Sequence, residues 1–235
     1  TYDIYRHDYE EFVTGSTSTR VTSNSGATTL FDSTFYVVTT DRNVYKCLDN
    51  DGNTASTVEP TGTSTSVITT GDGYKWKYMY TLSAAQQSNF LSTDFMAVAT
   101  NSTVSSAATD GGIDIVKIKT AGSSYTVTGG GTSGTITNVP IRGDGSSAVC
   151  SVTITSGAIT AVTITTNGSG YTSGYIRNAD IIGATGAGGA GSGAELDVII
   201  PPKGGHGFNA VEELGGFFVM LNTTLEGTES SNSGD

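Results

Sequence analysis

The fold is decided by Tyr74-Lys75-Trp76-Lys77-Tyr78-Met79-Tyr80-Thr81-Leu82, the clearest alternation of large apolar and polar residues in the chain. Successive side chains of a β-strand point to opposite faces, so the aromatic residues and Leu82 are expected on one face. Lys75, Lys77 and Met79 are expected on the other face. A face with this much aromatic surface has to be covered, so the stretch predicts a strand with one buried side.

Short runs before this stretch have the same character. Residues 35–38 and 44–48 alternate apolar and polar residues and are separated by Gly, Asn and Asp, which is typical of strands joined by turns. Helix signals are few: Ser83 can cap a short helix over 84–87, and a second helix is expected over 209–214. The chain is therefore predicted to be mainly β with a few short helices.

An internal repeat lies between the two expected helices. Residues 118–126 align with residues 164–172 at an offset of 46, which places Tyr125 on Tyr171. Two copies are too few for a free-standing solenoid, so the copies are expected to pack on each other or on the rest of the chain. The same offset pairs strand positions that should face a shared interior, namely Cys150, Val152 and Ile154 with Leu196, Val198 and Ile200.

This repeat divides the chain into three predicted regions. Residues 1–112 are expected to form a multi-strand β core segment, and residues 113–204 a twin 46-residue β repeat module with copies at 113–154 and 159–200. Residues 205–235 are expected to return to the core with a short helix and to be C-terminally truncated.

Charge and composition exclude two classes of partner. The chain has 11 basic and 22 acidic residues, and its net charge of −11 would repel phosphate backbones and anionic lipid. The apolar run at 217–221 is far shorter than the roughly 20 residues that cross a bilayer. Nucleic-acid binding and membrane association are therefore not expected.

Glycine-rich and acidic segments resemble ligand loops only in part. Residues 186–191 spell G-x-G-x-x-G, but a strand-like segment follows where a dinucleotide site needs a helix. Residues 49–54 resemble the start of a calcium loop, but Thr54 stands where such a loop needs Gly and Pro60 where it needs Glu. No cofactor, bound metal or small-molecule substrate is expected.

Catalytic residue sets are also lacking. Cys47 and Cys150 are expected to be free thiols, and together with His7 and His206 they are too few for a zinc site. Adjacent carboxylates, as at Glu10-Glu11 and Glu212-Glu213, point to opposite faces of a strand and cannot flank one bond. His206 lies among glycines and is expected in a turn. An enzyme is not expected.

Three strings resemble the central motif of the baseplate wedge protein family known as gene product eight in T-even-type contractile-tailed phages. The strings are 44–49, 56–60 and 71–80, and their order, spacing and aromatic positions all agree with that motif. The segment 206–222 is similar to versions in cyanophage relatives, so the resemblance covers roughly residues 1–100 and 200–228. The motif residues are Tyr45, Cys47, Glu59, Pro60, Asp72, Gly73, Tyr74, Trp76, Tyr78 and Tyr80.

The resemblance implies a structural role in the virion. A member of this family would be assembled in the host cytoplasm into the tail baseplate, pair with itself as a homodimer in its full-length form, and contact other wedge proteins. Two departures stand out: the T-even form lacks the twin repeat, and family members carry N- and C-terminal regions that this chain lacks. The chain is therefore expected to be a fragment.

Two questions stay open at the level of sequence. Tyr74, Trp76 and Tyr78 suit either the core or an interface. Tyr125 and Tyr171, at equivalent loop positions, could stack on sugar, which would make the chain a carbohydrate-binding or adhesin-type module of a fibre or surface protein. Exposure separates these alternatives, because aromatic residues that stack on a ligand lie open to solvent.

Overall fold

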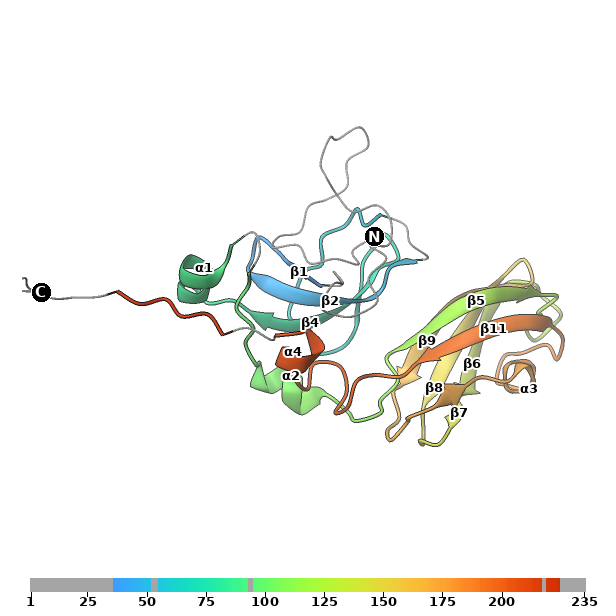
Figure 1. Cartoon of the computed structure of the whole chain (residues 1–235). Coiled ribbons are helices and arrows are strands. Elements are labelled where there is room, and N and C mark those ends of the chain that lie inside the picture. Colours follow the sequence, from blue (N-terminus) through green and yellow to red (C-terminus); the bar gives the residue numbers. More distant parts are fainter. Residues whose placement is uncertain (1–35, 52–54, 93–94, 217–218, 225–235) are drawn as a thin grey trace, which may run out of the picture.

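The strand predicted around Trp76 is present and belongs to a four-stranded antiparallel sheet. The computed structural model describes residues 36–51, 55–92, 95–216 and 219–224. The sheet has the order β1-β2-β4-β3 and consists of β1 (Tyr36–Val38), β2 (Asn43–Asp49), β3 (Ile68–Thr69) and β4 (Lys75–Thr81). With three short helices it forms the first lobe, which comprises the described residues within 36–112 and 203–216. This lobe is joined end to end to a second lobe, residues 113–200 (Figure 1).

Each helix of the first lobe begins at a polar cap. Ser83 caps α1 (Ala84–Phe90) through a reciprocal pair of hydrogen bonds with Gln86, as the sequence predicts. Asn209 caps α4 (Ala210–Glu213), which confirms the second expected helix. Helix α2 (Ser102–Ala107), capped by Asn101, was not predicted. The prediction of a mainly β chain with a few short helices is confirmed.

The prediction that Tyr80 and Leu82 share one face with Tyr74, Trp76 and Tyr78 is wrong. Lys77 and Met79 are buried as deeply as the aromatic residues. Tyr80 and Leu82 pack with Met79 in a cluster separate from that of Tyr74, Trp76 and Tyr78. A shift in the pairing of β2 with β4 between Val44 and Tyr45 interrupts the simple alternation. Ala210 and Leu214, which follow the second lobe in sequence, pack in the same cluster and help to bury Met79.

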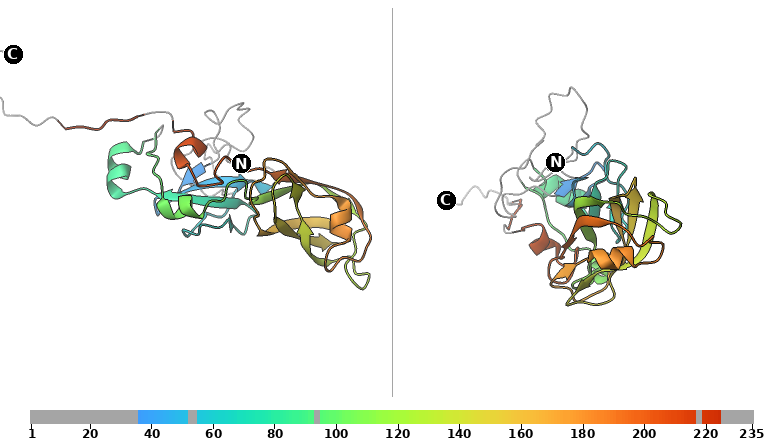
Figure 2. Two further views of the ribbon diagram at one scale, coloured as in Figure 1. Left: turned by 90° about the horizontal axis from the view of Figure 1, so that it is seen from below. Right: turned by 90° about the vertical axis from the view of Figure 1, so that its right-hand side faces the viewer.

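The second lobe has its own core. It contains β5 (Ile115–Ser123), β6 (Gly134–Pro140), β7 (Arg142–Gly143), β8 (Val149–Thr155), β9 (Ala158–Thr166), β10 (Gly174–Tyr175), α3 (Asn178–Ile182) and β11 (Ser192–Ile199). Strands β6, β8 and β9 form one sheet, while β5 pairs with β11 and β7 with β10. Seen from below, the two lobes again follow one another along the long axis of the molecule (Figure 2, left).

The six strand positions predicted to share an interior do so. Cys150, Val152 and Ile154 are buried in the core of the second lobe. Leu196, Val198 and Ile200 are half-buried and pack against the same core. The two copies nevertheless differ in their elements: β6 occupies the place in the first copy that α3 occupies in the second. The repeat as two copies of one β unit is not confirmed and stays a prediction.

Reciprocal contacts between the two segments support a duplication. The backbone N–H of Tyr125 donates to Gly157 O (3.0 Å), and that of Tyr171 donates to Gly111 O (3.2 Å). The Tyr125 hydroxyl accepts from the N–H of Ala194 (3.4 Å), and the Tyr171 hydroxyl accepts from that of Ala148 (3.3 Å). Each tyrosine therefore binds the other segment, at positions related by the predicted offset.

Gly145→Ala and Gly191→Ala should destabilise the second lobe to a similar extent. An added Cβ at Gly145 would overlap the buried ring of Tyr171, and one at Gly191 the buried ring of Tyr125. We expect each substitution to lower the free energy of unfolding by about 1–3 kcal/mol, the usual cost of overpacking. Urea unfolding measures this loss.

The matched control is Gly189→Ala, because Gly189 also has a positive φ but no atom near its Cβ position. Subtracting the loss of stability caused by Gly189→Ala from that caused by Gly191→Ala removes the cost of the strained backbone. The remainder is the cost of the overlap between the new Cβ and the ring of Tyr125. Gly145 has no positive φ, so Gly145→Ala needs no such subtraction. If Gly145→Ala is not destabilising, or if Gly191→Ala costs no more than Gly189→Ala, the two tyrosine contacts are not equivalent.

The second lobe is attached through two neighbouring segments. The N–H of Gly204 donates to Asp110 Oδ1 (2.6 Å), so the outgoing and returning chain lie together. The first and last strands of this lobe, β5 and β11, also pair with each other. The region boundaries given above stay a prediction. His7, Glu10 and Glu11 lie outside the described residues.

Candidate functional site

The residues that carry the family resemblance come together in the first lobe. Tyr45, Tyr74, Trp76 and Tyr78 share one buried cluster with exposed fractions between 0% and 4%. The rings of Tyr74 and Trp76 stack at 5.4 Å, and those of Tyr45 and Tyr78 meet edge to face at 5.8 Å. Tyr80 is equally buried in the neighbouring cluster. These aromatic residues therefore form the core of the lobe and not its surface.

Asp72 fixes the loop between β2 and β3 on the sheet. Its carboxylate accepts hydrogen bonds from Ser56 Oγ (2.8 Å), Thr57 N (2.7 Å), Val58 N (3.1 Å) and Thr70 Oγ1 (2.5 Å). Burial alone would raise the pKa of Asp72, but these hydrogen bonds outweigh it and lower the pKa. The conformation of the loop thus depends on an ionised Asp72.

The remaining motif residues complete the same unit. Glu59 Oε1 accepts from Thr40 N (3.3 Å), Pro60 is buried, and the Tyr45 hydroxyl donates to Gly62 O (2.5 Å). Gly73 has φ +85°, and a Cβ there would overlap the side chain of Asp51. Every motif position therefore has a local structural reason for its residue type.

Both cysteines are free, as predicted. Cys47 is half-buried against the aromatic cluster, and burial raises its pKa to about 12. Cys150 is buried in the second lobe, and burial raises its pKa to about 11. Since the thiolate is the nucleophile, neither thiol is activated for chemistry.

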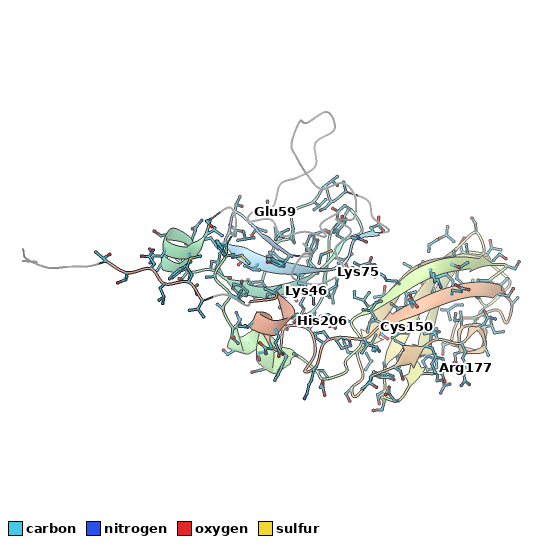
Figure 3. All side chains as sticks on the ribbon, viewed as in Figure 1. Lys46, Glu59, Lys75, Cys150, Arg177 and His206 are labelled. Atoms are coloured by element: carbon cyan, nitrogen blue, oxygen red, sulfur yellow. The ribbon has the colours of Figure 1, made fainter. Side chains whose placement is uncertain are left out.

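A buried charge cluster joins the returning chain to the sheet. Glu213 Oε1 accepts from Lys46 Nζ at 2.8 Å and from His206 Nδ1 at 2.6 Å, and Glu213 Oε2 accepts from Gly207 N at 2.6 Å. Figure 3 shows Lys46 and His206 close together beside α4. Burial alone would raise the pKa of Glu213, but the hydrogen bond from His206 and the charge of Lys46 lower it to about 2.

The sequence analysis missed this cluster. His206 lies in a turn, as predicted, but its buried partner was not foreseen. Glu212 and Glu213 were treated as a pair, although the structure exposes Glu212 and buries Glu213. The only signal was the position of Glu213 in a short helix that also carries apolar residues. Lys46 is 167 residues away in sequence, so no local pattern could reveal the partner.

A polar cleft of about 440 Å³ lies between the two lobes. Its first-lobe wall includes Thr65, Lys75, Lys77 and His206, and its second-lobe wall includes Asp114, residues 162–165 and Asn167. Within the described residues, no group of three or more His, Cys, Asp or Glu side chains could hold a metal ion. No helix in the described part of the chain is long and apolar enough to cross a membrane.

Tyr125 and Tyr171 do not line this cleft or any open surface. Their exposed fractions are 0% and 3%. The hydroxyl of Tyr125 donates to Asn178 Oδ1 (2.6 Å), and that of Tyr171 donates to Ile141 O (2.9 Å). Both rings are core residues, so the sugar-stacking role suggested for them from the sequence is wrong.

A comparison of the chain with protein-family models, with curated proteins and with solved structures finds no match. The function is therefore argued from the motif residues, the two lobes and the cleft themselves.

Proposed function

We propose that this chain is a structural component of a phage tail baseplate wedge and acts through protein–protein contacts. The observation that carries the proposal is the packing of the three strings at 44–49, 56–60 and 71–80. They resemble the wedge-protein motif as separate strings, yet they fold into one unit around the aromatic cluster and Asp72. Residues that build a core determine how a lobe folds, so their packing into one unit supports the resemblance.

The surface of the chain offers apolar contact area for neighbouring proteins. Phe208 and Val211 on the returning segment are 50% and 42% exposed. Val219 and Leu221 are 89% and 87% exposed on an extended segment that passes α1 and leaves the first lobe (Figures 1 and 2). These exposed apolar side chains are available for contact with a neighbouring protein.

The proposed partners are a second copy of the chain in its full-length form and other baseplate wedge proteins. Under this proposal the protein is located in the tail baseplate of the virion after assembly in the host cytoplasm. The full-length protein should therefore be dimeric by multi-angle light scattering at micromolar concentration, and a monomer would contradict the self-association.

Immunogold electron microscopy of the particles whose genome encodes the chain tests the location. Antibodies raised against the purified chain should label the end of the tail, because that is where the baseplate is built. Pre-immune serum from the same animals is the control. Label on the capsid or on fibres alone, or no label above the control, would contradict the proposal.

The carbohydrate-binding alternative rested on Tyr125 and Tyr171. Both side chains are buried, so no observation among the described residues favours it.

A further inference from the structure

The cleft between the lobes contains a buried cation, Lys77, that has no charged partner among the residues that the structure describes. Lys77, on β4, is 4% exposed, and its Nζ donates to Thr65 O at 2.5 Å. Lys77 forms no ion pair with any carboxylate among the described residues. A lysine ammonium has three donors, and a buried charge is costly unless it is paired. At least one strong donor of Lys77 is therefore available to a group in the cleft.

Neighbouring carboxylates are already engaged. Asp49 is shared by Lys75 (3.7 Å) and Lys117 (3.6 Å), and Glu213 is shared by Lys46 and His206. On the opposite wall, Asp114 accepts from Asn167 Nδ2 (2.5 Å). Among the described residues that line the cleft, the charged amines are Lys75 and Lys77 and the carboxylate is Asp114. Lys75 has an ion pair with Asp49, and no ion pair is found for Lys77 within the described part of the chain.

The lining is suited to a small charged group. Lys75 and Lys77 are two residues apart on β4, and both line the cleft. Figure 3 shows Lys75 at the side of the first lobe that faces the second lobe. The hydroxyl-bearing residues Thr65, Ser66 and Thr69 line the same wall. An ammonium pair with hydroxyls around it matches the acceptor oxygens of an oxyanion.

We propose that this cleft binds a single oxyanion group, a carboxylate or a phosphate, on the ammonium of Lys77 with Lys75 as the second cation. Asp114 would repel the same group and so confines it to the first-lobe wall. The site is independent of the baseplate proposal, since it rests on the cleft and on the charges around it.

Isothermal titration of the full chain with inorganic phosphate and with citrate, each against sodium chloride of equal ionic strength, tests the site. Lys77→Met removes the ammonium and keeps the length of the side chain. We expect its dissociation constant for the bound probe to rise at least tenfold. Lys119→Met, at an exposed lysine of the second lobe with a 68% exposed side chain, removes the same charge and should leave binding unchanged within twofold.

Each result has one meaning. Binding of phosphate alone identifies a phosphate group, and binding of citrate alone a carboxylate; either supports the site if Lys77→Met weakens it. No binding of either probe, or equal binding by Lys77→Met and the unaltered chain, would overturn it. Circular dichroism checks folding, and if Lys77→Met does not fold, Lys75→Met decides: a loss of threefold or more supports the site, and no change overturns it.

Discussion

Glu213→Gln should lower the free energy of unfolding of the first lobe by about 3–5 kcal/mol, because it removes the buried carboxylate charge that pairs with Lys46 and His206. The substitution keeps the size of the side chain, so the loss reports charge and hydrogen bonding and not a cavity. Lys46 Nζ and His206 Nδ1 both lose an ionised acceptor. Urea unfolding followed by the fluorescence of Trp76, the single tryptophan, measures the effect in this lobe.

Glu212→Gln is the matched control. Glu212 is the neighbouring residue on α4 and is exposed, so its substitution should change the free energy of unfolding by less than about 0.5 kcal/mol. Equal effects of the two substitutions would show that the buried cluster does not stabilise the lobe.

The same cluster fixes the direction of the pH dependence. The pKa of Glu213 is lowered from 4.5 to about 2 in the folded chain. A carboxyl whose pKa is lower in the folded state than in the unfolded state stabilises the fold fully at pH values above the unfolded pKa. This stabilisation is lost as the pH falls towards the pKa of the folded state. Stability should therefore decrease between about pH 4.5 and pH 2, and Glu213→Gln should remove this part of the decrease.

Trp76→Ala should cost about 3–5 kcal/mol, the usual loss for removing a large buried side chain. Trp76 is fully buried and stacks on Tyr74. The second lobe has a separate core, so its unfolding transition should stay where it is. Differential scanning calorimetry, which resolves separate transitions, measures both effects.

Tyr175→Ala provides the comparison, because Tyr175 is an aromatic residue that is 45% exposed. It should change stability little. If Trp76→Ala left the stability of the first lobe unchanged and weakened self-association instead, the motif would be an interface and the assignment of these residues to the core would be wrong.

The sequence predicts the strands and caps of this chain better than it predicts what covers them. The alternation around Trp76 and the capping residues Ser83 and Asn209 are local signals, and each corresponds to an observed element. The burial of Lys77 and Met79 is not local, because it depends on the pairing shift with β2 and on the return of the chain after the second lobe.

The sequence also failed to predict the short helices that have no apolar face. Helix α2 has the sequence Ser-Thr-Val-Ser-Ser-Ala, with one buried residue, Val104, and α3 has only five residues. Neither carries the periodic apolar pattern by which a helix is recognised in sequence. Helix α3 also lies where the predicted repeat would place a strand equivalent to β6. The two copies therefore share the contacts of Tyr125 and Tyr171 but differ in this segment.

The central claim is that the chain works as a built-in part of the baseplate wedge, and cross-linking mass spectrometry on purified intact tails tests it most directly. Lys119 and Lys203 are exposed, and Lys117 has a 41% exposed side chain, so lysine-reactive reagents can reach both the second lobe and the segment that joins it to the first. We expect cross-links from these lysines to other tail proteins and between two copies of the chain. Tails that contain the chain but yield only cross-links within one copy, or purified tails that lack the chain altogether, would contradict the claim.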